Sequence, residues 1–188
     1  MEPSDEALCQ RVAKRDEAAF DILVERYQER AYRLAWSILR NAEDARDLSQ
    51  EAFIRLYEAA GSYGGRAKFS TWFYRVLVNL CLDHKRKHRW RTLWARDEGD
   101  DRSAGPVLEH QPAPFADPVD DLGRQRTMKE LWAAVDRLAP RQRAAVLLQV
   151  QEELPTSEIA GVLKCSEATV RVHLHRALVT LRKTMAKR

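Results

Sequence analysis

Apolar residues recur at intervals of three and four along most of the chain, a period typical of amphipathic α-helices. Leu23, Tyr27 and Leu34, for example, fall on one face of a predicted helix. Asp16 and Asn41 each stand directly before such a helix, where a side-chain oxygen can cap a free amide of the first turn. The pattern predicts helices over residues 4–14, 17–40, 42–60, 70–96, 122–138 and 141–152. We therefore predict an all-α fold.

The last third of the chain holds two shorter periodic segments, separated by a break at residues 164–166. The first begins after Pro155, a residue that is tolerated at a helix start because an N–H is not needed there. Ser166 can cap the second. The apolar residues of this second segment share one face: Val170, Leu174, Ala177 and Leu181. Two small amphipathic helices joined by a tight turn predict a helix-turn-helix.

The opposite face of that last helix indicates what the helix-turn-helix binds. It is small or short-branched at Ala168, Thr169 and Val172, and becomes polar and cationic at His175 and Arg176. Small groups let a helix enter the major groove of DNA, and arginine binds guanine edges or phosphates. From the break onward the chain has seven Lys or Arg and one acid, a net charge of +6. A solvated basic face is the alternative, but the preceding helix and turn favour a DNA reader.

A change of composition divides the chain. Residues 97–121 carry eight acids, one arginine and four prolines, which prevent a continuous helix and are typical of a flexible segment. We therefore expect two small helical domains, over residues 1–96 and 122–188, joined by a flexible acidic linker over 97–121.

The overall composition excludes several classes of protein. The 188 residues are 45% hydrophobic and 32% charged, with a net charge of +4. No apolar run reaches the roughly 18 residues of a membrane span, and the polar start is unlike a signal peptide, so we predict a cytoplasmic protein with no membrane insertion. Three distant cysteines predict no disulfide framework. No paired carboxylates, nucleophile–base arrangement or phosphate-binding loop indicates catalysis, so we expect neither an enzyme nor a cofactor.

An aromatic cluster follows the glycine-containing loop at residues 61–68. Phe69, Trp72, Phe73 and Tyr74 fall within six positions, and one helix face cannot bury all four rings. We expect Phe69 and Tyr74 to be exposed. Exposed rings beside cations suit unpaired bases, since each stacked base contributes about 1–3 kcal/mol. The neighbouring cations are Arg66, Lys68 and Arg75. A purely structural aromatic core is the alternative.

A polar row continues along the same predicted helix, with Asn79, Asp83 and Arg86 at intervals of four and three. Asn and Arg can read base edges, while Asp83 can accept from a base amine or hold Arg86 in place. Residues 75–96 hold seven Lys or Arg and one Asp. The row therefore indicates single-stranded or melted DNA, with a charged solvated face as the alternative.

Four motifs follow one another along the chain: DARDLSQEAF at 44–53, FSTWFYRV at 69–76 with Asn79 behind it, LAPRQR at 138–143, and the helix-turn-helix. In this order and spacing they resemble the extracytoplasmic-function sigma factors of bacterial RNA polymerase. The resemblance covers nearly the whole chain except the linker.

The resemblance implies an initiation factor that binds core RNA polymerase, recognises promoter DNA and promotes strand opening. It implies polymerase contacts from Asp47, Gln50, Glu51 and Arg55. It implies binding and melting of the minus-ten element by Tyr63, Arg66, Lys68, Phe69, Trp72, Tyr74, Arg75, Asn79, Asp83 and Arg86. It implies that the last helices dock on the polymerase flap and read the minus-thirty-five element through Thr169, Arg171, Val172, His173, His175 and Arg176. An anti-sigma factor is a further partner that such proteins often have.

One residue departs from the family pattern at the turn of the helix-turn-helix. Lys164 stands where the family usually has glycine, and a left-handed conformation there would cost on the order of 1 kcal/mol.

Two other functions fit parts of the chain. A helix-turn-helix transcriptional regulator of the response-regulator output type would bind duplex DNA unaided, but residues 1–95 lack the strand pattern of a receiver domain. A zinc site would use Cys81, His84 and His88, at intervals of three and four. One helix rarely supplies three of four zinc ligands, so we expect no metal.

Overall fold

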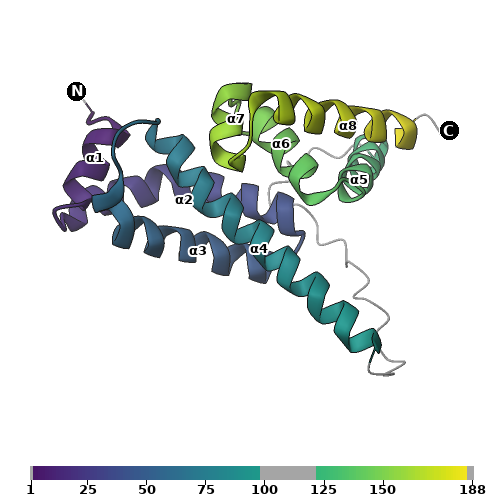
Figure 1. The fold of residues 1–188 in the computed structure, drawn as a ribbon, viewed down its shortest axis with the longest axis horizontal. Helices are drawn as coiled ribbons and strands as arrows, with labels where there is room; N and C mark the ends of the chain where they lie inside the picture. Colours follow the sequence, from purple (N-terminus) through teal and green to yellow (C-terminus); the bar gives the residue numbers. More distant parts are fainter. Residues whose placement is uncertain (1, 98–121, 186–188) are drawn as a thin grey trace.

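The protein is described by a computed structural model over residues 2–97 and 122–185, which consist of helices and the turns between them (Figure 1). The first half contains α1 (Asp5–Val12), α2 (Glu17–Leu39), α3 (Ala42–Ala59), the short 3₁₀ helix η1 (Ala60–Ser62) and α4 (Phe69–Asp97). The second half contains α5 (Leu122–Asp136), α6 (Pro140–Val150), α7 (Thr156–Leu163) and α8 (Glu167–Met185). The all-α prediction is confirmed. Residues 98–121 of the predicted linker lie outside the described residues.

Side-chain caps explain why the helices begin where the sequence predicts. Asp16 accepts from the amide of Ala19 at 3.1 Å, and Asn41 accepts from the amide of Asp44 at 3.1 Å. Each bond satisfies an amide that the helix itself leaves without a partner. Among the helices that the structure describes, none is both long and apolar enough to cross a bilayer.

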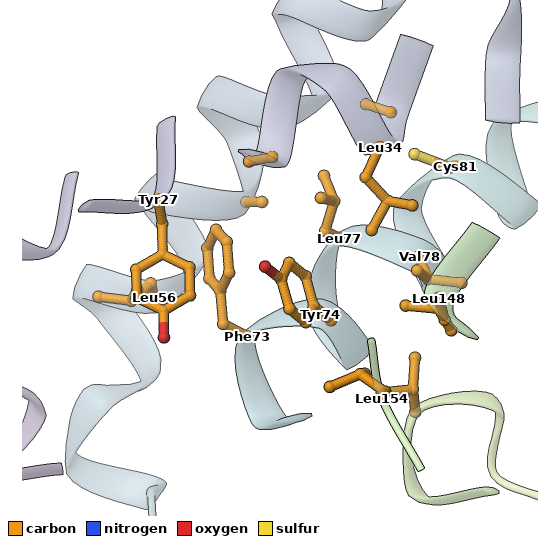
Figure 2. Packing of buried hydrophobic residues seen from close by; sticks show 14 of the residues in the cluster. Tyr27, Leu34, Leu56, Phe73, Tyr74, Leu77, Val78, Cys81, Leu148 and Leu154 are labelled. Atoms are coloured by element: carbon orange, nitrogen blue, oxygen red, sulfur yellow. The ribbon is translucent and has the colours of Figure 1, made fainter. Parts of the chain in front are cut away.

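The core of the first half is built around aromatic rings contributed by three helices. Tyr27 of α2 and Phe53 of α3 both pack against Phe73 of α4, with ring centroids 5.4 and 5.0 Å apart. Tyr74 follows Phe73 into the interior (Figure 2), and its hydroxyl donates to Glu152 of the second half. The rings of residues 69–74 therefore lie where the first half of the chain contacts the second half.

The two halves contact each other directly, in addition to the linker predicted between them. In Figure 1, α6 and α7 lie beside α2 and α4, and α4–α7 and α2–α6 are both contacting pairs. Buried Val78 of α4 lies against Leu148 of α6, and Leu154 lies nearby (Figure 2). One hydrophobic cluster thus runs through both halves.

Arg40 marks one end of this junction. It ends α2 in a left-handed conformation, with φ of 60°. Its guanidinium lies 3.9 Å from the ring centre of Trp36 and 4.6 Å from that of Trp132 in α5, and it faces Asp136 at 3.6 Å. A cation between two indoles is stabilised by both ring faces. The arrangement needs residues from both halves.

Arg143 of α6 joins the halves at the same end. Its side chain is only 5% exposed, and a buried charge must be hydrogen-bonded or paired to be tolerated. Its Nη1 donates to the carbonyl of Ile38 at 3.1 Å and its Nε donates to the carbonyl of Val135 at 3.2 Å. Asp136 supplies the opposite charge at 3.2 Å. One side chain therefore ties the end of α2 to α5.

Candidate nucleic-acid and polymerase interfaces

The helix-turn-helix forms as predicted, from α7 and α8. Ser166 caps α8, accepting from the amide of Thr169 at 3.2 Å. Lys164 takes the left-handed turn conformation, with φ of 51° and ψ of 52°. That conformation lets the amide of Cys165 reach the carbonyl of Ala160 at 3.1 Å, which closes the end of α7. The turn orients α8 without a glycine.

The outer face of α8 is open. Thr169, Arg171, His175 and Arg176 are exposed, and Val172 is 46% exposed. The inner face is packed through Val170 and Ala177, which are fully buried. The predicted division of this helix into a buried apolar face and an accessible, partly cationic face is confirmed.

His173 differs from its neighbours on α8 because it is half-buried. Burial, reinforced by the nearby charges of Arg141 and Arg176, lowers the pKa of His173 below its usual value. Its Nδ1 is buried without a hydrogen-bond partner among the described residues. At neutral pH this residue is an uncharged ring on the edge of the reading face rather than an additional cation.

The start of α4 contradicts the expectation for two rings. Phe69 and Tyr74 are both fully buried, whereas we expected them to be the exposed members of the cluster. Phe69 packs edge to face on Tyr27, at 5.3 Å between ring centroids. The hydroxyl of Tyr74 donates to Glu152, in the connection between α6 and α7. The prediction was wrong because the partners of both rings come from segments far away in the sequence.

The accessible rings beside the glycine-containing loop are instead Tyr63 and Trp72. Both are half-buried, and their ring centroids lie 5.5 Å apart. The hydroxyl of Tyr63 donates to the carbonyl of Ala67 at 2.6 Å, which bends the loop back on itself. Arg66 is exposed at the tip. Two partly accessible rings therefore lie together beside a loop that carries an exposed cation.

The loop is joined to α4 by a residue that sequence reasoning missed. The amide of Phe69 donates to a carboxylate oxygen of Glu6 in α1 at 3.1 Å. A carboxylate at a helix start satisfies a free amide and interacts favourably with the helix dipole. Lys68, which precedes the helix, has no side-chain acceptor, so the cap comes from another helix. No local sequence signal identifies such a cap.

Further along α4 the polar row lies on the surface. Asp83 and Arg86 are exposed and form an ion pair with each other at 3.0 Å, while Asn79 is half-buried. His84 contacts Asp44 of α3 at 3.2 Å, and Cys81 is fully buried. Across residues 2–97 and 122–185 no cluster of three or more side chains able to hold a metal ion is found.

The residues predicted to contact polymerase lie on α3. Asp47, Gln50 and Arg55 are exposed, and Glu51 is half-buried and pairs with Arg55 at 2.8 Å. Beside them a groove of about 750 Å³ runs between α2 and α3. Its lining combines apolar and polar side chains: Phe20, Val24, Gln28, Glu29, Tyr32, Arg46, Ser49, Gln50 and Phe53.

Two carboxylates and one arginine at the junction of the halves were not singled out by sequence reasoning. Glu158 of α7 contacts Lys68 and Thr71, and Glu152 contacts Arg30 and Tyr74. In all four contacts the partner is 78 to 122 residues away in the chain. Separations of this size carry no local signal.

Comparisons with known proteins find two families, in the order of the two halves. Sigma-70 region 2 matches residues 23–91, and Sigma-70, region 4 matches residues 128–181.

Relatives extend this similarity over nearly the entire chain. The ECF RNA polymerase sigma factor SigE of Mycolicibacterium smegmatis is 36% identical, over 100% of this chain and 71% of its own length. The ECF RNA polymerase sigma factor SigW of Bacillus subtilis is 31% identical, over 93% of this chain and 92% of its own.

Solved structures share the fold. CnrH, in complex with the cytosolic domain of CnrY, superimposes with a TM-score of 0.69 at 17% identity, over 97% of each chain. The sigma factor RpoE of Bartonella quintana, in complex with the anti-sigma factor NepR, gives 0.67 at 20% identity, over 90% of this chain and 98% of its own.

Proposed function

The chain belongs to the extracytoplasmic-function sigma factors of RNA polymerase, and we propose that three of its surfaces divide the work of transcription initiation between them. Sigma factors bind core RNA polymerase and promoter DNA, and they are not enzymes. In keeping with this, we propose that the protein acts in the cytoplasm, carries out no chemistry and requires no cofactor.

The first surface is the outer face of α3, which we propose as the contact with core polymerase. Asp47, Gln50, Glu51 and Arg55 present alternating charge and amide groups along one helix. The groove beside them offers apolar surface at Phe20 and Phe53. Polar groups around an apolar centre are the composition of a specific protein interface.

The second surface is α8, which we propose reads the minus-thirty-five element. The single observation that carries this proposal is the exposed row on α8, including Arg171, Val172 and Arg176, behind a capped helix-turn-helix. Arginine supplies base and phosphate contacts, and Val172 is able to touch a thymine methyl. Thr169 and His175 complete the exposed row, and half-buried His173 lies at its edge.

The third surface is the loop and the outer side of α4, which we propose binds and melts the minus-ten element. Tyr63 and Trp72 are the rings available to stack on unpaired bases, and Arg66 is an exposed cation on the same loop as Tyr63. Asn79, Asp83 and Arg86 extend the surface along α4. In this proposal the buried rings of Phe69 and Tyr74 do not contact DNA but support the surface from the hydrophobic core.

We further propose that an anti-sigma factor binds this chain. RpoE of Bartonella quintana, which has the same fold, was solved in complex with the anti-sigma factor NepR.

Run-off transcription with purified core polymerase and a library of randomised promoters tests the proposed function. We expect the full chain to direct specific starts that core polymerase alone does not produce. A chain that binds duplex DNA tightly by itself and leaves polymerase unaffected would instead be a regulator of the response-regulator output type, and the proposal would be wrong.

A further inference from the structure

We propose that the protein binds a small inorganic anion, of the size of chloride, where Arg40, Lys85 and Arg143 lie around Asp136. None of these residues belongs to the surfaces proposed to contact polymerase or DNA, so the inference does not depend on the proposed function. Two kinds of observation carry it: an excess of positive charge away from water, and buried N–H donors without an acceptor. We call Arg40, Lys85 and Arg143 the cationic cluster.

The cationic cluster comes from three helices and shares one carboxylate. Arg40 ends α2, Lys85 lies in α4 and Arg143 lies in α6. Nη1 of Arg143 lies 3.2 Å from Oδ1 of Asp136, and Nε of Arg40 lies 3.6 Å from the same oxygen. Lys85 is close enough for the charges of all three groups to act on its ammonium. Over residues 2–97 and 122–185 no second carboxylate pairs with the cluster, so three positive charges face one negative charge.

The surplus positive charge is largely out of contact with water. The side chains of Arg40 and Arg143 are 6% and 5% exposed, and Lys85 is half-buried. Burial lowers the pKa of Arg40 and of Arg143, and it lowers the pKa of Lys85 to about 8. All three groups are still charged at neutral pH, and their surroundings destabilise each charge. Taking ions out of water costs free energy that opposite charges must offset, and an anion beside the cluster would do so.

Two N–H groups at the cluster supply donors for such an anion. Nη1 of Arg40 and Nε1 of Trp36 are both buried without a hydrogen-bond partner among the described residues. The guanidinium carbon of Arg40 lies 3.9 Å from the ring centre of Trp36, so the two donors belong to one contact. Buried donors in native proteins nearly always have a partner, because a donor without one costs the free energy of its desolvation. An anion that accepts from Nη1 of Arg40 would also place its charge among the three cations.

The contacts of Arg40 favour a monatomic anion over a phosphate. Arginine binds a phosphate through two parallel N–H bonds, but Nε of Arg40 already faces Asp136, which leaves Nη1 as the buried nitrogen without an acceptor. Trp36 and Trp132 pack on the guanidinium, at 3.9 and 4.6 Å from its carbon to their ring centres. A single spherical ion needs only one or two donors and positive surroundings. Chloride has this chemistry and is the probe that we choose.

The first test measures thermal unfolding of the full chain while sodium chloride replaces sodium gluconate. The ionic strength stays constant, so the screening of surface charges does not change. The cluster is assembled from three helices only in the folded protein, and a ligand that binds only the folded state stabilises it by mass action. If half-saturation lies at about 10 mM, about 100 mM chloride should raise Tm by about 3–5 °C. An unchanged Tm would overturn the proposal.

Two variants of the cluster separate a specific site from a general effect of chloride. Lys85→Met removes one surplus charge and keeps an apolar stem, and Arg40→Lys keeps the charge but removes Nη1. Each should lose at least about half of the rise in Tm that chloride produces in the wild type, because affinity depends on both the charge and the donor. The quantity compared is the rise caused by chloride, which is measured for each variant whatever its own stability.

Matched controls make the same two exchanges on the exposed side of α8. Lys183→Met and Arg182→Lys change residues that are exposed, and each alters the net charge as its counterpart in the cluster does. Both should retain the full rise in Tm with chloride. An equal rise in the wild type and all four variants would be a general salt effect, and the proposal would be wrong.

The second test locates the ion. Bromide replaces chloride at such sites and scatters X-rays anomalously, so a crystal of the full chain soaked in sodium bromide should show an anomalous peak within hydrogen-bond distance of Nη1 of Arg40. Peaks confined to the protein surface would overturn the assignment of the site. A chain that directs transcription with core polymerase but shows neither the peak nor the rise in Tm would refute this inference alone and leave the proposed function intact.

Discussion

The starts of α4 and α8 were both predicted to bind DNA but have opposite surroundings. Both predictions rested on nearby cations, Lys68 and Arg75 for α4 and Arg171 and Arg176 for α8. On α8 the reading face is open, with Arg171 and Arg176 exposed. On α4 the corresponding groups contact the second half: Tyr74 is fully buried, and Lys68, although exposed, is paired to Glu158.

The difference shows that residue type alone does not decide whether a surface is available. α8 packs on its own half through an apolar face centred on Val170 and Ala177, which leaves the opposite face of the helix exposed. α4 is the central helix of the first half and also the place where α7 docks. A residue of α4 that contacts DNA is therefore also close to the packing between the two halves, whereas a residue on the outer face of α8 is not.

The sharpest way to test this comparison is to shorten one side chain on each helix. Phe73→Ala on α4 removes a fully buried ring that packs on Tyr27 and Phe53. We expect the free energy of unfolding to fall by about 3–5 kcal/mol. Val172→Ala on α8 should change it by less than about 0.5 kcal/mol. Urea denaturation followed by circular dichroism measures both, and a similar loss in the two variants would contradict the comparison.

The functional counterpart is Arg176→Ala on the open face of α8. Loss of one arginine contact to DNA should cost about 1–3 kcal/mol of promoter binding, while affinity for core polymerase and the stability of the fold stay unchanged. Run-off transcription and a pull-down with core polymerase report the two quantities separately. Equal losses in both assays would show that this face of α8 serves the polymerase rather than DNA.

The two helices should also differ in how their lysines make the stability of the protein depend on pH. Burial of Lys85 on α4, reinforced by the nearby Arg143, lowers the pKa of its ammonium from 10.5 to about 8. Between these two values the unfolded chain binds more protons than the native protein, so the contribution of Lys85 to stability increases as pH rises. We expect a gain on the order of 1 kcal/mol from pH 8 to 10.

Comparison with Lys85→Met isolates this contribution. In that variant the free energy of unfolding should not show the part of the rise with pH that Lys85 causes. Lys183→Met, on the exposed side of α8, should retain the pH profile of the wild type. Denaturation at a series of pH values measures the three profiles, and coincident profiles for the wild type and Lys85→Met would contradict the prediction.

The smallest expected effect concerns the turn before α8. Lys164→Gly relieves the left-handed backbone of Lys164, and we expect a gain of about 0.5 kcal/mol in the free energy of unfolding. Ala168→Gly, within α8, should change stability in the opposite direction because glycine disfavours a helix. Thermal denaturation compares the two, and a loss in both variants would show that the turn is not strained.

Much of the fold was predictable because its signals are local. Asp16, Asn41 and Ser166 each cap the helix that follows them, and a cap needs information from only a few neighbouring residues. The exposed face of α8 was predictable for a similar reason, since the helical period assigns its buried and exposed residues to opposite sides.

The surroundings of the α4 rings were not predictable, because they depend on packing between distant segments. Whether Tyr74 faces water or protein depends on Glu152, 78 residues later in the chain. Helical periodicity establishes that Phe69 and Tyr74 cannot both share a face with Trp72, but it does not reveal how many faces of α4 are covered. Here α2, α3, α6 and α7 all contact α4.

The two indoles around Arg40 give the protein an optical signal of its own. Trp36 belongs to the first half and Trp132 to the second, and their ring centroids lie 5.5 Å apart. Moving the halves apart would transfer both rings from a stacked guanidinium into water, which changes the emission of tryptophan. Intrinsic fluorescence would then follow the separation of the halves in unlabelled protein, in real time, during mixing with polymerase.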